Sequence, residues 1–236
     1  MLLIKAIVFY LGYWSSTILY GLLSLPLLAL PPHYGAKVML SWNDFIIWWL
    51  KITCNVRINI TGNTQFPSGA SVIVANHQSP WETFFFQRYF SPLTTILKKE
   101  LLNIPFFGWG LRLMDPMAID RSQPFQSLKQ IQEMSLQRLA LGKNVLIFPE
   151  GTRMPVDQLG EYKRSAADIA KQAGVPIIPI AHNSGTHWLN KKLIKLPGVI
   201  QVVIGEPIFI EQQSTKVVIK SIQQWTEQQQ AILNNT

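Results

Sequence analysis

The stretch SVIVANHQSPWETFFFQRYF, residues 71–90, joins two apolar runs of different character through a polar junction. Its first five residues are typical of a short buried strand, and its last ten are typical of a helix. The junction favours a helix start, with Ser79 as the N-cap, Pro80 at the first helical position and Glu82 three residues after the cap. A strand that passes directly into a helix predicts a layered α/β fold.

The same alternation continues over residues 53–236. A last helix is expected to bury one face that carries Val218, Ile222, Trp225 and Ile232. This order predicts one α/β domain, a layered mixed sheet flanked by helices, at 53–236. The further strands are expected at 56–60, 94–97, 117–119, 144–148, 176–181 and 199–204, and the further helices from Pro124 to Gly142 and near 163–172.

Residues 1–52 are far more apolar than the rest. From Leu2 to Leu30 the only charged residue is Lys5. At 1.5 Å per residue, about 25 apolar residues span roughly 37 Å, which is enough to cross a bilayer core. A second apolar segment at 36–52 is rich in tryptophan, a residue favoured at the water–lipid interface. Residues 1–52 are therefore expected to form membrane-anchoring helices.

Three arrangements fit this N-terminal segment. It forms one spanning helix followed by an interfacial helix, or a helical hairpin that dips into one leaflet, and the sequence does not separate these two. A cleaved signal peptide is the third. Cleavage is disfavoured, because the apolar run is longer than a signal peptide requires and no clear A-x-A site follows it.

Composition restricts the class of partner. Charged residues make up only 14% of the chain, and 21 Lys and Arg against 13 Asp and Glu give a formal net charge of +8. Such a chain suits an anionic membrane surface or a phosphorylated substrate. Nucleic acid is not expected as a partner, because the charges are scattered and no nucleic-acid-binding motif is present. The single cysteine, Cys54, excludes an intrachain disulfide and a cysteine-based zinc site.

Polar clusters follow several of the expected strands. Taken singly, each has a structural explanation, such as a packed histidine, a capping-box glutamate, an ion pair or a turn in which Gly151 has a positive φ. Ligand sites of α/β sheets form where strands end, so the clusters are expected to meet there, beside a wall formed by the apolar stretch 175–180. The clusters are Asn76-His77 with Glu82, Lys98-Lys99-Glu100-Leu101, Asp120-Arg121, and Phe148-Pro149-Glu150-Gly151-Thr152-Arg153.

Together and in this order, the clusters closely resemble the motifs of the 1-acylglycerol-3-phosphate acyltransferases, the lysophosphatidate acyltransferase family. That family carries N-H-x4-D, K-x-E-L, a short motif ending in D-R, F-P-E-G-T-R and V-P-I-x-P. The resemblance covers about residues 55–205, and F-P-E-G-T-R with the upstream histidine motif is highly specific. One departure is Glu82, where the family more often has aspartate; the longer side chain can still reach the imidazole.

The resemblance implies an enzyme that transfers a fatty acyl group from a thioester to the sn-2 hydroxyl of 1-acylglycerol 3-phosphate, giving phosphatidate. His77 is expected to be the general base, with Glu82 fixing its tautomer. The phosphate is expected to contact Lys98, Arg121 and Arg153, and the substrate-binding set is completed by Glu150, Gly151 and Thr152.

No cofactor and no metal are expected, because the sequence lacks a P-loop, a dinucleotide fingerprint and an HExxH motif. A nucleophile elbow is also absent, which fits direct transfer from acyl-CoA or acyl-carrier protein as co-substrate. The expected location is a membrane, a bacterial inner membrane with the active site on its cytoplasmic face. Two alternatives stay open: acylation of glycerol 3-phosphate or another lysolipid, and a non-catalytic anionic-lipid-binding membrane protein.

Overall fold

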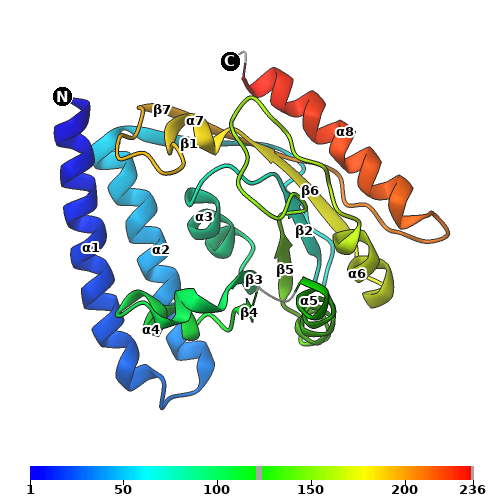
Figure 1. Cartoon of the computed structure of the whole chain (residues 1–236), viewed down its shortest axis with the longest axis horizontal. Coiled ribbons are helices and arrows are strands. Elements are labelled where there is room, and N and C mark those ends of the chain that lie inside the picture. The colour runs from blue at the N-terminus through cyan, green and yellow to red at the C-terminus, as the bar shows by residue number, and fades with distance from the viewer. Residues whose placement is uncertain (121–123, 235–236) are drawn as a thin grey trace.

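Seven strands form one mixed sheet with helices on both faces (Figure 1). The computed structural model describes residues 1–120 and 124–234. The strand order is β1-β7-β6-β2-β5-β3-β4, which confirms the predicted α/β class. The strands are β1 (Val56–Gly62), β2 (Val72–Ala75), β3 (Leu93–Lys98), β4 (Met117–Ile119), β5 (Asn144–Ile147), β6 (Ile177–His182) and β7 (Gly198–Ile204).

The central strands run parallel to one another. Strand β2 pairs in parallel with β5 and β6, β5 pairs with β3, and β3 pairs with β4. Strand β7 is antiparallel to β6, and β1 runs parallel to β7. All four residues of β2 are buried, as expected for a parallel strand covered on both faces. The carboxyl ends of β6, β2, β5, β3 and β4 therefore lie at one edge of the sheet.

Two hydrophobic cores cover the two faces of this sheet. Ile73 and Ala75 of β2 pack in the first core, and Val72 and Val74 pack in the second, because alternate side chains of a strand point to opposite faces. The first core is covered by α1 (Leu2–Leu27), α2 (Pro32–Cys54) and α3 (Trp81–Tyr89), and the second by α5 (Pro124–Ala140), α6 (Ser165–Ala173) and α8 (Thr215–Leu233).

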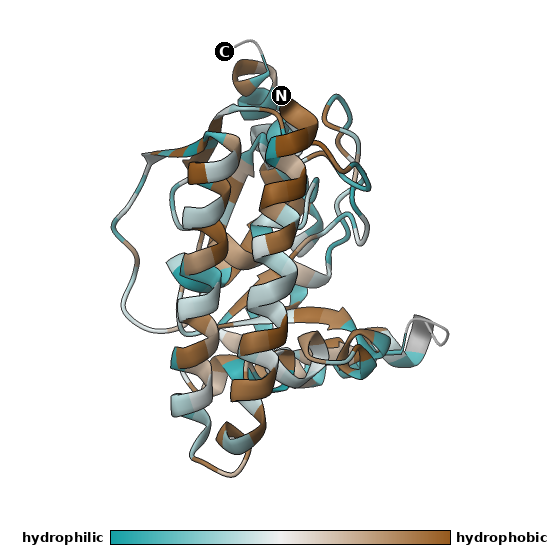
Figure 2. Ribbon diagram, turned by 90° about the vertical axis from the view of Figure 1, so that its left-hand side faces the viewer, coloured by the Kyte–Doolittle hydropathy of each residue, from teal (hydrophilic) through white to brown (hydrophobic). Residues whose placement is uncertain are grey.

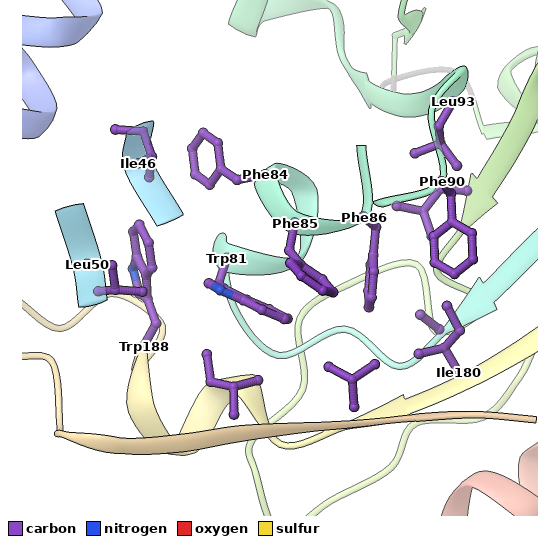
Figure 3. Close-up of a cluster of buried hydrophobic side chains, with 14 of the residues drawn as sticks. Ile46, Leu50, Trp81, Phe84, Phe85, Phe86, Phe90, Leu93, Ile180 and Trp188 are labelled. Carbon is purple, nitrogen blue, oxygen red and sulfur yellow. The ribbon is translucent and has the colours of Figure 1, made fainter. Parts of the chain in front are cut away.

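Helix α3 fills the first core with aromatic side chains. Trp81 and Phe86 are fully buried, and the ring of Trp81 stacks on that of Phe85 with centroids 4.5 Å apart. Figure 3 shows these rings between the sheet and α2, whose Ile46 and Leu50 face them. The N-terminal helices thus share one core with the sheet, and their separation from it as a unit at residues 1–52 stays a prediction.

Helices α1 and α2 form a hairpin along this layer. Figure 2 shows them side by side, with hydrophobic turns repeated along both. The indole N–H of Trp49 donates to the carbonyl of Phe9 at 3.1 Å. A Cβ atom on Gly12 would lie 2.2 Å from the same indole nitrogen, so the close approach of the two helices needs glycine there. Among the described residues, one helix, α1, is long and apolar enough to cross a membrane.

Several details differ from the sequence-based expectations. Helix α3 begins at Trp81, with Pro80 as its N-cap, one residue later than predicted. In α8, Leu233 is buried and Ile232 is 60% exposed, so the predicted face was wrong at its end; buried Thr226 and Gln230 continue the inward stripe and hide its position. The short elements η1 (Lys99–Asn103), α4 (Phe107–Arg112) and α7 (Ser184–His187) were not predicted.

The stretch 175–180 is not a wall of the strand-end site. It leads into β6 and forms most of that central strand, where Ile177, Ile178 and Ile180 are buried in the two cores. The carboxyl edge is reached by His182, the last residue of β6, and by the residues that follow it.

Candidate active site

The predicted polar clusters lie at the carboxyl edge of the parallel strands. His77 follows β2, the segment Phe148–Arg153 follows β5, and Lys98 is the last residue of β3. Lys98 is in register with Ile119, which places Asp120 at the same edge. Arg121 lies outside the described residues. The His77 segment and the loop after β5 are in direct contact, and Lys98 and Asp120 lie at the same edge of the sheet.

His77 and Glu82 are in direct contact. Nδ1 of His77 is hydrogen-bonded to Oε2 of Glu82, which is fully buried, while the His77 side chain is 15% exposed. An ionised carboxylate only accepts hydrogen bonds, so Nδ1 carries the proton and Nε2 keeps a free lone pair. The imidazole also stacks on Phe148, with ring centroids 4.0 Å apart and an interplanar angle of 13°. Both the tautomer and the plane of His77 are thus fixed.

The second oxygen of Glu82 completes the helix start. Oε1 accepts from the N–H of Gln78 at 2.7 Å and from the N–H of Ser79 at 2.5 Å, and the hydroxyl of Ser184 donates to it at 2.8 Å. Burial alone would raise the pKa of Glu82, but the imidazoles of His182 and His77 and the donated hydrogen bonds lower it below its ordinary value. Glu82 therefore caps α3 with one oxygen and holds His77 with the other.

The loop after β5 is hydrogen-bonded to both the N–H and the carbonyl of His77. Oε2 of Glu150 accepts from the N–H of His77 at 2.7 Å, and the N–H of Met154 donates to the His77 carbonyl at 2.7 Å. Gly151 has φ +73°, as expected for the turn between them. Thr152 and Arg153 are exposed beside this turn.

Comparison with known proteins identifies the family. A family model described as Acyltransferase matches residues 57–183. The 1-acyl-sn-glycerol-3-phosphate acyltransferase of Pseudomonas aeruginosa is 42% identical over 218 residues, which are 91% of this chain and 84% of that protein. The chain belongs to the acyltransferase family of these enzymes. The proposed resemblance is therefore confirmed.

Further relatives agree with this assignment. The probable 1-acyl-sn-glycerol-3-phosphate acyltransferase of Mycoplasma pneumoniae is 34% identical over 76% of this acyltransferase and 72% of the relative. The yeast enzyme of the same name, from Saccharomyces cerevisiae, is 29% identical, and this chain spans only 55% of its length. The crystal structure of the Thermotoga maritima 1-acyl-sn-glycerophosphate acyltransferase matches with a TM-score of 0.79 at 22% identity, over 98% of this chain and 96% of that one, and shows the same fold.

Arg153 and Lys98 are the basic residues of the predicted site that the structure describes. Partial burial lowers the pKa of Arg153, and the negative charge of Glu82 acts in the opposite direction. Arg153 therefore lies within the electrostatic reach of that carboxylate. Lys98 is exposed at the end of β3, two strands along the sheet from β2. No group of three or more His, Cys, Asp or Glu side chains that could hold a metal ion occurs among the described residues.

Two residues of this site were missed in the sequence. His182 ends β6 and Ser184 begins α7, and both are fully buried against the residues that follow β2. His182 belongs to none of the motifs recognised in the sequence, and no local pattern singles out a buried serine. The signal available was positional, because both lie at the carboxyl end of a buried parallel strand, close to the position that His77 has after β2.

The carboxyl of Glu150 makes the stability of the acyltransferase depend on pH. Burial, with a smaller contribution from the negative charge of Glu82, raises the pKa of Glu150 to about 7, although the N–H groups of Gly160 and His77 act against it. A raised carboxyl pKa means that the folded chain binds the proton more tightly than the unfolded chain does. The resulting stability is present below the unfolded-state pKa and is lost as pH rises through about 7.

We therefore expect the free energy of unfolding of the wild type, relative to Glu150→Gln, to fall by about 2–3 kcal/mol between pH 4.5 and 7.5. The amide does not titrate, so the difference between the two proteins isolates Glu150. Thermal unfolding in detergent across this pH range measures it. Parallel pH dependences for both proteins would contradict the assignment.

Proposed function

We propose that this acyltransferase transfers a fatty acyl group from a thioester donor to the sn-2 hydroxyl of 1-acylglycerol 3-phosphate and forms phosphatidate. The observation that carries the proposal is the His77–Glu82 pair, held at the strand ends by the F-P-E-G-T-R loop. The relatives are named as 1-acyl-sn-glycerol-3-phosphate acyltransferases, which supports the choice of acceptor.

In the proposed reaction, Nε2 of His77 takes the proton of the acceptor hydroxyl as its oxygen attacks the thioester carbonyl carbon. The tetrahedral intermediate then collapses, the carbon–sulfur bond breaks, and the imidazolium returns the proton to the departing thiolate. Glu82 stabilises the imidazolium and keeps the proton on Nδ1 throughout. Transfer is direct, because the hydroxyls of Ser79 and Ser184 are hydrogen-bonded on the carboxylate side of the pair.

The acceptor phosphate is proposed to contact Arg153, Lys98 and Arg121, with Gly151 and Thr152 in the same loop. Arginine suits this task because its fork binds phosphate oxygens in two places. The hydrogen bond from the N–H of Met154 to the His77 carbonyl supports this role for Arg153, because it ties the residue that follows Arg153 to the backbone of His77.

We expect Arg153→Ala to raise KM for lysophosphatidate by roughly 10- to 100-fold, since a lost charge-assisted hydrogen bond costs about 1.5–3 kcal/mol. KM for the acyl donor should change little. Initial rates with each substrate varied in turn measure both constants. The matched control is Arg164→Ala, which removes an exposed arginine paired with Asp168 on α6. Equal increases for both substrates would show that Arg153 does not serve the phosphate.

The N-terminal hairpin is proposed to lie in one leaflet of the membrane. Apolar side chains on α1, including Ile4, Leu11 and Ile18, are exposed in a stripe of helical spacing. The other side of α1 contacts the α/β domain at both ends: Phe9 packs on Trp188, and Gly21 lies against Phe106. A fully spanning α1 would draw both of these contacts into the bilayer, which supports insertion of the hairpin from one side. That side is proposed to be the cytoplasmic face of a bacterial inner membrane.

The triple variant Ile4→Glu, Leu11→Glu, Ile18→Glu is expected to move most of the folded enzyme from carbonate-washed membranes into the supernatant. Three charges on the exposed stripe oppose insertion into lipid, each by about 2–3 kcal/mol at depth. The matched control places three charges on the exposed side chains of Gln212, Gln224 and Gln228. A triple variant that stays in the membrane pellet would show that this stripe does not hold the chain there.

The acceptor and donor are tested directly with purified enzyme in detergent. A panel of lysophosphatidate, glycerol 3-phosphate and other lysolipids is offered with labelled acyl-CoA and labelled acyl-carrier protein. Lysophosphatidate is expected to give the highest kcat/KM. Preference for another acceptor would replace the proposed substrate, and no transfer to any acceptor would favour a lipid-binding protein.

A further inference from the structure

The end of strand β6 carries a buried polar group that lies against the His77–Glu82 pair. Ala75 of β2 is in register with Ile180 of β6, so both strands end side by side. His182 and Ser184 are each fully buried there, although neither has a part in the proposed acyl transfer. Burying such groups is costly unless each polar atom has a partner.

His182 is hydrogen-bonded to Asn76, the residue before His77. The amide of Asn76 donates to the His182 carbonyl at 3.0 Å, and the N–H of His182 donates to the Asn76 side-chain oxygen at 3.1 Å. Nε2 of His182 donates to the carbonyl of Asn76 at 2.8 Å, and Nδ1 accepts from the N–H of Ser184 at 3.3 Å. Because a carbonyl only accepts, His182 carries its proton on Nε2. Three of these hydrogen bonds join the ends of β2 and β6, and the fourth holds the N–H of Ser184 against His182.

Ser184 connects these hydrogen bonds to Glu82. Its hydroxyl donates to Oε1 at 2.8 Å, and since the carboxylate has no proton to give, the direction of this hydrogen bond is fixed. The hydroxyl of Ser79, 2.9 Å away, must then donate to Ser184, and it accepts in turn from the N–H of Trp81 at 3.2 Å. The hydroxyl of Ser79 thus donates to Ser184, and that of Ser184 donates to Oε1. Among the described residues, Oε2 is hydrogen-bonded to His77.

We infer that Ser184 is a positioning residue for acyl transfer, which holds Oε1 of Glu82 so that Oε2 orients and charges the His77 imidazole, and that His182 fixes Ser184 in place. This inference rests on the proposed function of His77. Ser184 touches neither substrate, so its loss affects the rate of the chemical step rather than binding.

Ser184→Ala is expected to lower kcat about 10- to 100-fold and to change KM for both substrates less than twofold, because the lost contact is a hydrogen bond to a charged group. The acid limb of the pH dependence of kcat/KM is expected to move to higher pH, since a carboxylate with one donor fewer holds the imidazole proton more tightly. The other titratable groups that act on Glu82 or on His77, namely His182, Glu150 and Arg153, are unchanged in this variant.

The matched control is Ser135→Ala, which removes a fully buried hydroxyl on α5 whose contact is the sulfur of Met117. It is expected to leave kcat and the pH profile unchanged. Ser79→Ala provides a second variant if Ser184→Ala does not fold, because it removes the next donor in the chain and should shift the same limb by a smaller amount.

His77→Ala is assayed in parallel to separate two failures. Wild-type kcat and pH profile in folded Ser184→Ala, with an inactive His77→Ala, would overturn the positioning role alone. An active His77→Ala would overturn the proposed function on which it rests. If Ser184→Ala and Ser135→Ala lower kcat equally and neither moves the pH profile, the role of Ser184 is purely structural.

Discussion

Replacement of His77 by alanine is expected to lower kcat by about 10⁴-fold, the upper end of what a general base contributes. The imidazole is fixed by Glu82 on one nitrogen and by the Phe148 ring on one face, so alanine removes a base that is already held in one tautomer and one plane. Labelled phosphatidate formed from lysophosphatidate and acyl donor measures the loss. KM should change little, since the proposed phosphate contacts come from other residues.

The control for this variant is His33→Ala, which removes an exposed histidine of α2. Its activity should equal that of the wild type. Folded His77→Ala enzyme that keeps more than about a tenth of the wild-type kcat would show that another group removes the proton.

Glu82→Gln is expected to keep its fold and lose activity by up to about 10⁴-fold, as the orienting carboxylate of a hydrolytic triad does when it becomes an amide. The two oxygens of Glu82 have separate partners. Oε2 is hydrogen-bonded to Nδ1 of His77. Oε1 accepts hydrogen bonds from the N–H groups of Gln78 and Ser79 and from the hydroxyl of Ser184. The amide oxygen can take the first position and keep the helix cap. Its NH₂ group then faces Nδ1 of His77 and forces the proton onto Nε2.

Activity and thermal unfolding measured on the same preparation separate the two roles of Glu82. Glu82→Asp serves as the matched variant, since it keeps the charge on a shorter side chain and should retain a measurable fraction of activity. A stable and fully active Glu82→Gln enzyme would show that Glu82 only caps α3.

Individual helices and strands were predictable because the hydrophobic periodicity that marks them is a property of neighbouring residues. Strand β4 was predicted at 117–119, where it is found, and the strand and helix around His77 were predicted within about one residue. The order of strands was not predictable in this way. The antiparallel placement of β7 between β1 and β6 depends on which strand edges meet, and no local pattern states it.

In the candidate site, too, contacts between residues close in sequence were predictable and contacts between distant residues were not. The contact between His77 and Glu82 was predicted because five positions at a helix start bring the two side chains together. Ser184 donates to Glu82 across 102 positions, and a buried serine carries no local mark of its partner. Lys98 ends β3 and Arg153 stands in the loop after β5, as the sequence predicted, while their roles in phosphate binding stay predictions.

The core shared by α2, α3 and β7 has a consequence for biosynthesis. The N-terminal hairpin is translated before the α/β domain, yet its buried face lies in one core with Phe86 and with Ile200 and Val202 of β7. Until β7 is synthesised, that face has no complete partner, and exposed aromatic surface favours aggregation. The nascent enzyme therefore completes this core only after β7 has been translated, long after the helices that share it.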